Sequence, residues 1–422
     1  MNMTQGAKPQ ADMTGHKFKP VEEQLAYLKK GAAEVIPEPE LRAKLERSFR
    51  TGKPLRVYLG VDPTAPDIHL GHTVVLRKLK HFQDLGHTAI FLIGDFSAMI
   101  GDPTGRSETR PPVSREEVDA NAKTYLAQVF KLLDKDKTEV RHNSEWLDTL
   151  SSQEIVRLCS HYRLARMLER EDFRSRLDKQ QPISVHELLY PLLTAFDAVQ
   201  LKSDVELGAT EQKVNLLIHR DIQREYGLEG EVAFTMPILV GLDGQRKMSK
   251  SFGNYVGITE PPDEMFGKIM SIADDLMWTY YDLVTDGSPE EIAALKAAIA
   301  SGAAHPMDVK MRLGRDVVSG FHGDDAAHRA ADHFQRVFRD RQAPEDATVQ
   351  KVPLSAPTKL VGLLVEWKLA PSKSEATRLI EQGGVEVDGV RVDDVRKEVD
   401  LSKPSSFLLR AGKKNFRRII VE

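Results

Sequence analysis

The sequence predicts an α/β fold, built on a doubly wound parallel sheet and followed by a helical domain and a small α+β module. Three observations predict it. Strand-like and helix-like segments alternate over the first part of the chain, the next part shows only helical spacing, and the last part mixes both kinds of segment. We expect a flexible N-terminus, the α/β domain, the helical domain, a linker and the module to span residues 1–20, 21–258, 259–340, 341–358 and 359–422.

The first strand–helix–strand unit defines the sheet. Residues 55–61 form a continuous apolar strand pattern, residues 70–85 have helical spacing that stops at Gly86, and residues 88–94 are again strand-like. This spacing is typical of parallel sheets, which bind ligands beyond the carboxyl ends of their strands. The polar segments 62–67 and 101–106 follow those two strands, so we expect the site there.

The remaining elements follow the same logic. Residues 184–201 have helical spacing despite Pro191, residues 204–208 predict a short strand, and Thr210 is a candidate cap for a helix that runs to about Tyr226. The helical domain shows apolar helical spacing in three segments, residues 265–270, 289–300 and 308–321. Pro344, Pro353 and Pro357 stand among polar residues, which predicts the linker.

The composition excludes several classes of protein. The chain is 41% hydrophobic and 29% charged, as is typical of a globular protein. It has no apolar run long enough for a membrane span, and residues 1–20 lack the apolar core of a secretory signal. Cys159 is the only cysteine, which excludes an intrachain disulfide and a thiolate metal cluster. We therefore expect a cytoplasmic protein without a membrane partner.

The segment Lys247-Met248-Ser249-Lys250-Ser251 is the most informative motif. It follows a glycine-containing turn, and its two lysines stand three residues apart, so that two ammonium groups are available to hold a triphosphate. A solvated basic loop is the alternative interpretation. The match of the whole five-residue string, rather than of its charges alone, favours nucleotide binding.

The segment His69-Leu70-Gly71-His72 opens the first predicted helix. The two imidazoles share a face, and the free N–H groups and dipole of the helix start suit phosphate. Alone, such a pair is more often two surface histidines, and a zinc pair lacks a further ligand at a suitable spacing, so we predict no metal site. Together with the lysine motif, phosphate binding is favoured. A P-loop is not, because residues 101–107 have the wrong glycine spacing and Arg106 in place of lysine.

The two motifs together resemble the signature pair of the class I aminoacyl-tRNA synthetases. Residues 58–64, 100–104 and 190–197, and the run to Gln212, narrow the resemblance to bacterial tyrosyl-tRNA synthetases with a full lysine motif. The resemblance extends over nearly the whole chain. It implies a Rossmann-like catalytic domain, a helical anticodon-proximal domain, and a C-terminal RNA-binding module that is also found in a ribosomal small-subunit protein.

The resemblance also implies roles for individual residues. It assigns tyrosine binding to Tyr58, Gly60, Asp62, Asp102, Tyr190, Thr194, Asp197 and Gln212. Of these, Tyr58 and Asp197 would bind the phenol, and Asp102 and Tyr190 the α-amino group. A carboxylate and a hydroxyl satisfy a phenol, which both donates and accepts a hydrogen bond, whereas phenylalanine would leave them unpaired.

The nucleotide-binding assignments come from the same resemblance. It implies that the catalytic set is Thr64, His69, His72, Lys247 and Lys250, and that ATP also contacts Gly71, Arg106, Glu211, Met248, Ser249 and Ser251. Three residues depart from the family pattern: Thr194 replaces a glutamine, Ala209 a glycine, and Glu211 an aspartate that contacts the ribose.

The implied function is that of a tyrosine–tRNA ligase. Tyrosine would attack the α-phosphorus of ATP, and the 3′ end of tRNA(Tyr) would then take the tyrosine from the adenylate. ATP would enter as its Mg²⁺ complex, without a tightly bound cofactor, and the family is homodimeric; the apolar segment 125–133 is a candidate interface. The basic end of the chain is expected to contact tRNA through Arg410, Lys413, Lys414, Arg417 and Arg418. An ordinary solubilising charged end is the alternative.

Other functions remain open at this point. An HxGH-type nucleotidylyltransferase also binds ATP at a helix start, but such enzymes are usually shorter and need no RNA-binding module. A non-catalytic RNA-binding protein descended from a synthetase would not need His69, His72 and both lysines. A tryptophanyl-tRNA synthetase is the nearest competitor within the class; it normally lacks the C-terminal module and has no use for Asp197 at the phenol position.

Overall fold

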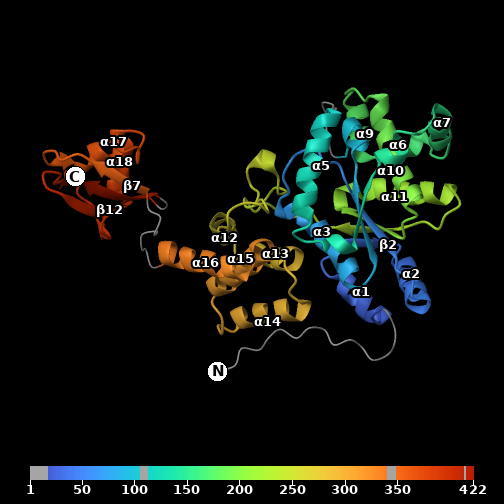
Figure 1. Cartoon of the computed structure of the whole chain (residues 1–422), viewed down its shortest axis with the longest axis horizontal. Helices are drawn as coiled ribbons and strands as arrows, with labels where there is room; N and C mark the ends of the chain where they lie inside the picture. The colour runs from blue at the N-terminus through green and yellow to red at the C-terminus, as the bar shows by residue number, and fades with distance from the viewer. Residues whose placement is uncertain (1–17, 105–112, 340–347, 413–414) are drawn as a thin grey trace. The chain divides into compact units, whose positions relative to one another are not determined.

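The computed structural model describes residues 18–104, 113–339, 348–412 and 415–422. Its contacts divide the chain into two compact units, Met1–Ala327 and His328–Glu422 (Figure 1). None of the helices in the described ranges has the length and apolar character that crossing a bilayer requires. The division between the units falls inside a helix, and the boundary predicted at residue 258 stays a prediction.

A six-stranded sheet forms the centre of the first unit, in the order β1-β6-β5-β2-β3-β4. The strands β2 to β6 are parallel, and β1 pairs antiparallel with β6 at one edge. The chain builds outward from β2 through β3 and β4, then returns to add β5 and β6 on the other side of β2. The predicted doubly wound sheet is confirmed, and its switch point lies between β2 and β5. The strands are β1 Glu34–Ile36, β2 Arg56–Val61, β3 Thr88–Ile93, β4 Thr138–His142, β5 Val205–Ala209 and β6 Val232–Met236.

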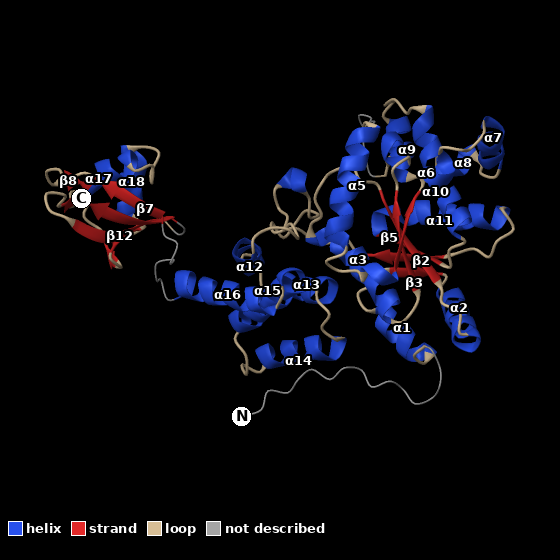
Figure 2. Cartoon of the chain, in the orientation of Figure 1, coloured by secondary structure: helices blue, strands red, loops and turns tan. Residues whose placement is uncertain are grey.

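The helices of this domain cover the sheet (Figure 2). Those that precede or follow the first strands are α1 Val21–Lys29, α2 Glu38–Thr51, α3 Leu70–Asp84, α4 Ser97–Ile100 and α5 Arg115–Val129. The later ones are α6 Ser144–Leu147, α7 Ser152–Ser160, α8 Leu164–Met167, α9 Glu171–Asp178, α10 Val185–Leu201 and α11 Lys213–Glu225. Helices α10 and α11 pack on the face of the sheet that carries Tyr58, Ile90 and Leu92, and this contact forms a continuous apolar core.

The predicted elements recur with small shifts. Helix α3 ends before Gly86, whose φ of 88° is favourable only for glycine, and α10 contains Pro191 as expected. The expectation that Thr210 caps the following helix is wrong. Thr210 lies in a short 3₁₀ turn, Thr210–Gln212, and α11 begins only at Lys213, because the Gln212 side chain accepts a bond from Ala209 N (3.0 Å) and closes that turn first.

The helical part contains α12 Pro262–Met270, α13 Leu276–Val284, α14 Pro289–Ala300, α15 Pro306–His322 and α16 Asp324–Phe334. The three predicted helical segments coincide with α12, α14 and α15. Helices α12 and α15 approach closely at Gly314, where a Cβ atom would lie 2.7 Å from the ring of Phe266. The Tyr280 hydroxyl of α13 donates to Val240 O (2.9 Å), which ties the helical part to the segment that precedes the lysine motif.

The second unit is an α+β module with its own core. Its main sheet has the order β10-β9-β12-β13-β7, and β11 pairs with β8. The elements are β7 Thr348–Val352, β8 Thr358–Lys359, α17 Leu360–Glu366, α18 Lys373–Glu381, β9 Val385–Val387, β10 Val390–Arg391, β11 Glu398–Val399, β12 Ser405–Ala411 and β13 Asn415–Val421. The linker predicted over residues 341–358 is therefore too long: β7 lies inside it, and it belongs to the module because it pairs in parallel with the edge of β13.

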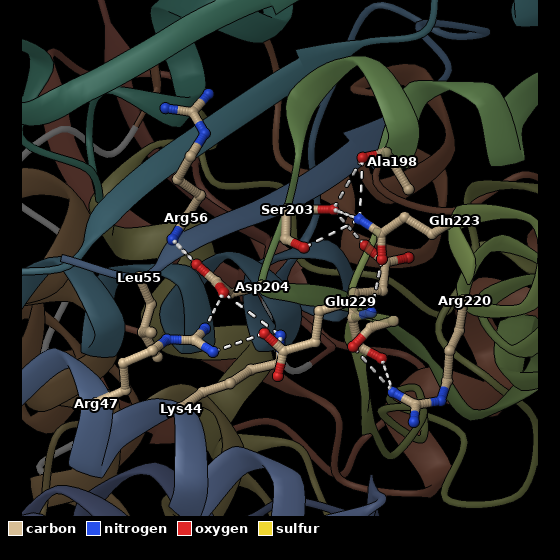
Figure 3. Close-up of polar contacts among 12 residues, drawn as sticks. Lys44, Arg47, Leu55, Arg56, Ala198, Ser203, Asp204, Arg220, Gln223 and Glu229 are labelled. Atoms are coloured by element: carbon tan, nitrogen blue, oxygen red, sulfur yellow. Dashed lines mark hydrogen bonds and ion pairs between the residues drawn. The ribbon is translucent and has the colours of Figure 1, made fainter. Parts of the chain in front are cut away.

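A polar cluster joins the amino-terminal edge of the first sheet to α2 (Figure 3). The Asp204 carboxylate, just before β5, accepts from Arg56 N at the start of β2 (3.0 Å) and from Arg47 Nη2 (3.0 Å). It also pairs with the ammonium group of Lys44 (3.4 Å), whose side chain is only 1% exposed. These bonds hold β2 and β5 together at the edge opposite to their carboxyl ends, where the predicted site residues lie.

We predict that Asp204→Ala lowers the free energy of unfolding by about 2–3 kcal/mol, because it leaves a buried ammonium group short of its partner. Urea denaturation of both proteins measures this. Glu229 also pairs with Lys44 (3.5 Å) but is half exposed, so Glu229→Gln is the matched control and should cost less than about 1 kcal/mol. Equal losses in the two variants would contradict a structural role specific to Asp204.

Candidate active site

A cavity of about 450 Å³ lies at the carboxyl ends of β2, β3 and β5. It brings together residues that the sequence distributes over more than 150 positions. The predicted site residues in its lining are Tyr58, Gly60, Asp62, Thr64, Gly71, His72, Asp102, Tyr190, Thr194, Asp197, Glu211 and Gln212. The predicted residues His69, Lys247, Met248, Ser249, Lys250 and Ser251 are not part of the lining. Arg106, Lys413 and Lys414 lie outside the described residues.

Asp197 of α10 is a buried carboxylate at this cavity, with 3% of its surface exposed. Its oxygens accept from Trp146 Nε1 (2.7 Å) and Asn143 Nδ2 (3.2 Å). Burial raises the pKa of Asp197 well above its usual value, against the effect of these two donors. The carboxylate is therefore fixed in orientation and poorly solvated, which makes it a strong acceptor for a polar group that enters the cavity.

Sequence analysis missed Asn143 and Trp146. Asn143 follows β4 directly and Trp146 lies in α6, the next element; Asn143 also donates to Ser97 Oγ (3.0 Å). The signal that was present is positional: polar side chains after a parallel strand lie at the edge of the sheet that binds ligands. Nothing in the local sequence indicates that they would meet Asp197, which lies more than fifty residues further along the chain.

Tyr58 of β2 presents a buried hydroxyl at the same cavity. By geometry it makes no well-formed hydrogen bond within the described residues, although the Glu206 carboxylate lies close enough to interact with it. Burial, followed by the charge of Glu206, raises the pKa of Tyr58 well above its usual value, so the group is a neutral phenol. A buried hydroxyl that is poorly paired can take a further partner, and a polar ligand group in the cavity would supply it.

Asp62, which follows β2, anchors a second polar group. Its carboxylate accepts from the hydroxyls of Tyr190 (2.9 Å) and Ser97 (2.6 Å). Gly94 makes this possible, since a Cβ atom there would lie 2.1 Å from Asp62 Oδ1. Asp102 is fixed nearby in the lining by a bond from Thr104 N (2.9 Å). Ser97 and Gly94 were not identified from the sequence.

The two motif histidines fold onto the start of α3. His69 Nδ1 accepts from Gly71 N (3.1 Å), and His72 Nδ1 accepts from His69 N (3.2 Å). Because each Nδ1 is an acceptor, each neutral ring carries its hydrogen on Nε2. Burial, and then neighbouring positive charge, lowers the pKa to about 3 for His69 and to about 4 for His72. They are thus neutral hydrogen-bond donors. Gly71 leaves room for the His69 ring, since a Cβ atom at residue 71 would lie 2.9 Å from it.

The lysine motif lies beside the cavity, and the ammonium group of each lysine contacts an acidic residue. Lys247 Nζ lies 3.1 Å from both carboxylate oxygens of Glu211, and Lys250 Nζ donates to Asp67 O (2.7 Å). Met248 anchors the loop: its side chain is buried, and its backbone N–H donates to Leu239 O (2.8 Å). Glu211, the departure from the family pattern, thus holds Lys247 at the edge of the cavity.

A polar group lies deeper, behind Tyr58 and Asp197. Glu206 of β5, His219 of α11 and Glu231 beside β6 place nitrogen and carboxylate atoms within 4.8 Å of one another, which is a spacing that metal ligands also have. Burial raises the pKa of Glu206 to about 7 and that of Glu231 well above its usual value. Protonation of Glu231 accounts for two acids sharing a buried site. The predicted absence of a metal stays a prediction.

The basic residues predicted to contact tRNA lie on the β12–β13 hairpin of the second unit. Arg410 donates to Glu386 (2.9 Å), Arg417 donates to Gln350 (2.5 Å), and Arg418 is exposed. The segment 125–133 has Val129 and Leu133 buried inside the first unit, whereas Leu126 and Phe130 are half-buried, so only part of it is available to a second copy.

Comparison with known proteins assigns the family. The family model for "tRNA synthetases class I (W and Y)" matches residues 50–339, and the S4 domain model matches residues 358–403. The tyrosine–tRNA ligase of Geobacter sulfurreducens is 52% identical over 402 residues, which cover 94% of this chain and 99% of that protein. The corresponding protein of Moorella thermoacetica is also 52% identical over 402 residues, covering 94% and 96%.

Solved structures agree with this. A tyrosyl-tRNA synthetase from Archaeoglobus fulgidus, complexed with L-tyrosine, has a TM-score of 0.58 at 25% identity and covers 74% of this chain and 100% of that one. A truncated mitochondrial tyrosyl-tRNA synthetase of Aspergillus nidulans, at 22% identity and a TM-score of 0.63, shares the fold over 76% of this chain and 94% of its own. Neither a nucleotidylyltransferase nor a tryptophanyl enzyme is favoured by these matches. The chain belongs to the class I aminoacyl-tRNA synthetases, in the tyrosine–tRNA ligase family.

Proposed function

We propose that this chain activates tyrosine with ATP in the cavity at the carboxyl ends of β2, β3 and β5 and then transfers it to tRNA(Tyr). One observation carries the assignment to this cavity: Asp197 and Tyr58, a carboxylate and a hydroxyl, line the same space as His72 at the start of α3. An aromatic amino acid with a polar far end fits between such groups. Its carboxylate would then face the nucleotide.

The tyrosine phenol would donate to Asp197 and accept from Tyr58. For this contact, a lone pair of the Asp197 carboxylate must face the cavity. The hydrogen bonds from Trp146 and Asn143 fix the carboxylate and so set its orientation. The Tyr58 hydroxyl gains a well-placed partner in the cavity. Phenylalanine would leave both groups buried without a partner, and this supports selection of tyrosine without an editing site. The α-amino group would lie toward Asp102 and Tyr190.

The adenylate forms when the tyrosine carboxylate oxygen attacks the α-phosphorus of Mg-ATP and pyrophosphate leaves. No covalent enzyme intermediate is needed, so the chain's contribution is positioning and stabilisation of charge on the departing phosphates. Neutral His69 and His72 would donate through Nε2, together with the start of α3. Lys247 and Lys250 would exchange Glu211 and Asp67 for phosphate oxygens as the pyrophosphate leaves, which favours the transition state over the ground state.

The second step involves tRNA. The 3′-terminal adenosine hydroxyl would attack the mixed anhydride, with release of AMP. The S4 module with Arg410, Arg417 and Arg418 is the proposed electrostatic contact with tRNA, and the helical part would approach the anticodon stem. Mg²⁺ would arrive with ATP as part of the substrate.

We also propose a cytoplasmic homodimer. Large apolar side chains are exposed on successive elements from α7 to the start of α10, where Val156, Leu164 and Val185 are 69%, 58% and 74% exposed. An isologous contact between two copies would cover them. This surface replaces the segment 125–133 as the candidate interface.

We predict that Asp197→Asn raises the KM for tyrosine by about ten- to a hundredfold, because a charge-assisted bond to the phenol becomes a neutral one. The preference for tyrosine over phenylalanine should fall in parallel. ATP–pyrophosphate exchange with each amino acid measures both. The control is Asp221 on α11, a half-exposed acid that pairs with Arg166 and does not line the cavity, since Asp221→Asn should change neither value. An unaltered tyrosine-to-phenylalanine ratio in Asp197→Asn would be incompatible with the proposed phenol contact.

We predict that Lys250→Ala slows adenylate formation by about 10²-fold while the affinity for tyrosine stays the same, because the lost contact is made mainly in the transition state. Stopped-flow measurement of the single-turnover rate, with tyrosine binding measured separately, tests this. Lys80→Ala, which removes a surface lysine paired with Asp84, is the control. The phosphate role is wrong if tyrosine binding weakens as much as the rate.

We predict that removing residues 348–422 leaves ATP–pyrophosphate exchange intact and reduces tRNA charging at least tenfold. The cut precedes β7, because a cut after it would leave an unpaired strand of the module. Since the contact is electrostatic, charging by the full chain should fall with added salt more steeply than charging by the shortened one. Equal charging by both chains would show that the module does not bind tRNA.

A further inference from the structure

His219 connects a buried carboxylate to the lining of the cavity. On one side its Nδ1 lies 2.9 Å from both carboxylate oxygens of Glu206. On the other side its Nε2 lies 3.0 Å from the hydroxyl oxygen of Thr194, one turn after Tyr190 on α10. All three side chains are nearly fully buried and line the cavity. Thr194 stands where the family pattern has a glutamine, so the chain has a shorter polar side chain at this place and an imidazole behind it.

The geometry at Nδ1 indicates where the histidine hydrogen lies. Equal distances from Nδ1 to the two Glu206 oxygens fit an N–H that donates to both oxygens of an ionised carboxylate. If Glu206 were protonated, the oxygen that carries the hydrogen would lie closer to Nδ1 than the other. Burial lowers the pKa of His219 to about 4, so the ring is neutral and has a single hydrogen. With that hydrogen on Nδ1, Nε2 has a free lone pair and must accept.

Thr194 supplies the donor for Nε2. Its hydroxyl has one hydrogen, and two acceptors are in reach: His219 Nε2 and Tyr190 O (2.9 Å). The Tyr190 carbonyl lies within α10 and has the helix ladder to satisfy it, whereas Thr194 is the one donor that the described residues offer to Nε2. A hydrogen that points to His219 would leave the lone pairs of the Thr194 oxygen for the cavity, whereas one that points to Tyr190 O makes the ordinary back-bond of a helical threonine.

We propose that His219 is a positioning residue for amino-acid recognition: held by Glu206, it turns the Thr194 hydroxyl into an acceptor for the α-ammonium group of tyrosine. This inference rests on the proposed function and deepens it. A glutamine would offer its amide oxygen directly, whereas here the shorter threonine offers an acceptor because the imidazole takes up its hydrogen. The α-ammonium group is the one donor of tyrosine besides the phenol, and Asp197 already serves the phenol.

The neighbouring residues indicate that the Thr194 acceptor lies near the α-amino group of the proposed tyrosine ligand. Tyr190 and Asp102 line the cavity near it, and the charge of Asp102 acts on His219 in the direction that opposes burial. The groups that face Glu206 are Tyr58 from β2, His219 from α11, Glu231 beside β6 and Asp197 from α10. Because the pKa of Glu206 is raised to about 7 by burial, the acid is ionised above that pH and takes up a proton below it. A protonated Glu206 would donate to Nδ1 and reverse the relay.

The test compares two ligands, L-tyrosine and 3-(4-hydroxyphenyl)propionate, which is tyrosine without its amino group. Binding to the full chain is measured by calorimetry at about pH 8.5. Thr194→Val, which is nearly the same shape, should weaken tyrosine binding about tenfold and leave the analogue unchanged, since one bond to a charged donor is lost. Thr194→Ser should restore tyrosine binding. His219→Leu should act as Thr194→Val does, and the double variant should be no worse than either single one.

Two further measurements separate this role from a structural one. The ¹⁵N spectrum of His219, assigned through the His219→Leu variant, should show the hydrogen on Nδ1 at about pH 8.5 and a shift toward Nε2 as the pH falls through about 7. The tyrosine-to-analogue ratio should fall over the same range. Ser203→Ala, which removes a bond to Glu231 on the far side of the cluster, is the matched control and should leave the ratio unchanged.

The possible outcomes distinguish a failure of the hydrogen-bond relay from a failure of the proposed tyrosine pocket. If Thr194→Val weakens both ligands equally, or if His219 carries its hydrogen on Nε2 at about pH 8.5, the relay is wrong while the proposed function stands. If the unmodified chain binds neither ligand, the tyrosine pocket itself is wrong. If His219→Leu does not fold, Thr194→Val, Thr194→Ser and the ¹⁵N spectrum still decide the question.

Discussion

The buried carboxylate of Asp197 is the interaction on which the site depends. A charged group so far from water is stable only when donors hold it, and Trp146 and Asn143 do so from the segment after β4. This arrangement fixes the distance between α10 and the end of β4 and thereby the depth of the cavity. It also provides an oriented acceptor in the cavity, which the proposed phenol contact would use.

Electrostatic character changes from one end of the cavity to the other. Behind the proposed phenol position, burial raises the pKa values of Glu206 and Glu231, so that the two neighbouring acids need not both be charged. At the nucleotide end, burial lowers the pKa of His69 and His72, so those rings donate hydrogen bonds without carrying charge. In the described part of the chain, the lysine motif brings positive charge to the edge of the cavity, where Glu211 and Asp67 pair with it.

The structure explains two of the three departures from the family pattern, those at Thr194 and Glu211, but not the one at Ala209. Thr194 is shorter than glutamine, and His219 occupies the space behind it with a bond to its hydroxyl. Glu211 is longer than aspartate, and its carboxylate reaches Lys247. Ala209 has a backbone N–H bonded to Gln212, a bond that any residue can make, and nothing in the structure explains why glycine is absent there.

The sequence by itself determined the parallel sheet, most of its helices, the module and the family, because apolar periodicity and contiguous motifs are local properties of the chain. It also indicated which residues follow the carboxyl ends of strands, and twelve of the predicted site residues do line one cavity. Only the tertiary structure decided which side chains stand behind them. Asn143, Trp146, Ser97, Glu206 and His219 act through contacts with residues up to about fifty positions away. The same is true of β7, which looks like a linker until β13 pairs with it. Hydrogen bonds between distant segments leave no periodic signal in a single sequence, so their partners appear only when the chain is folded.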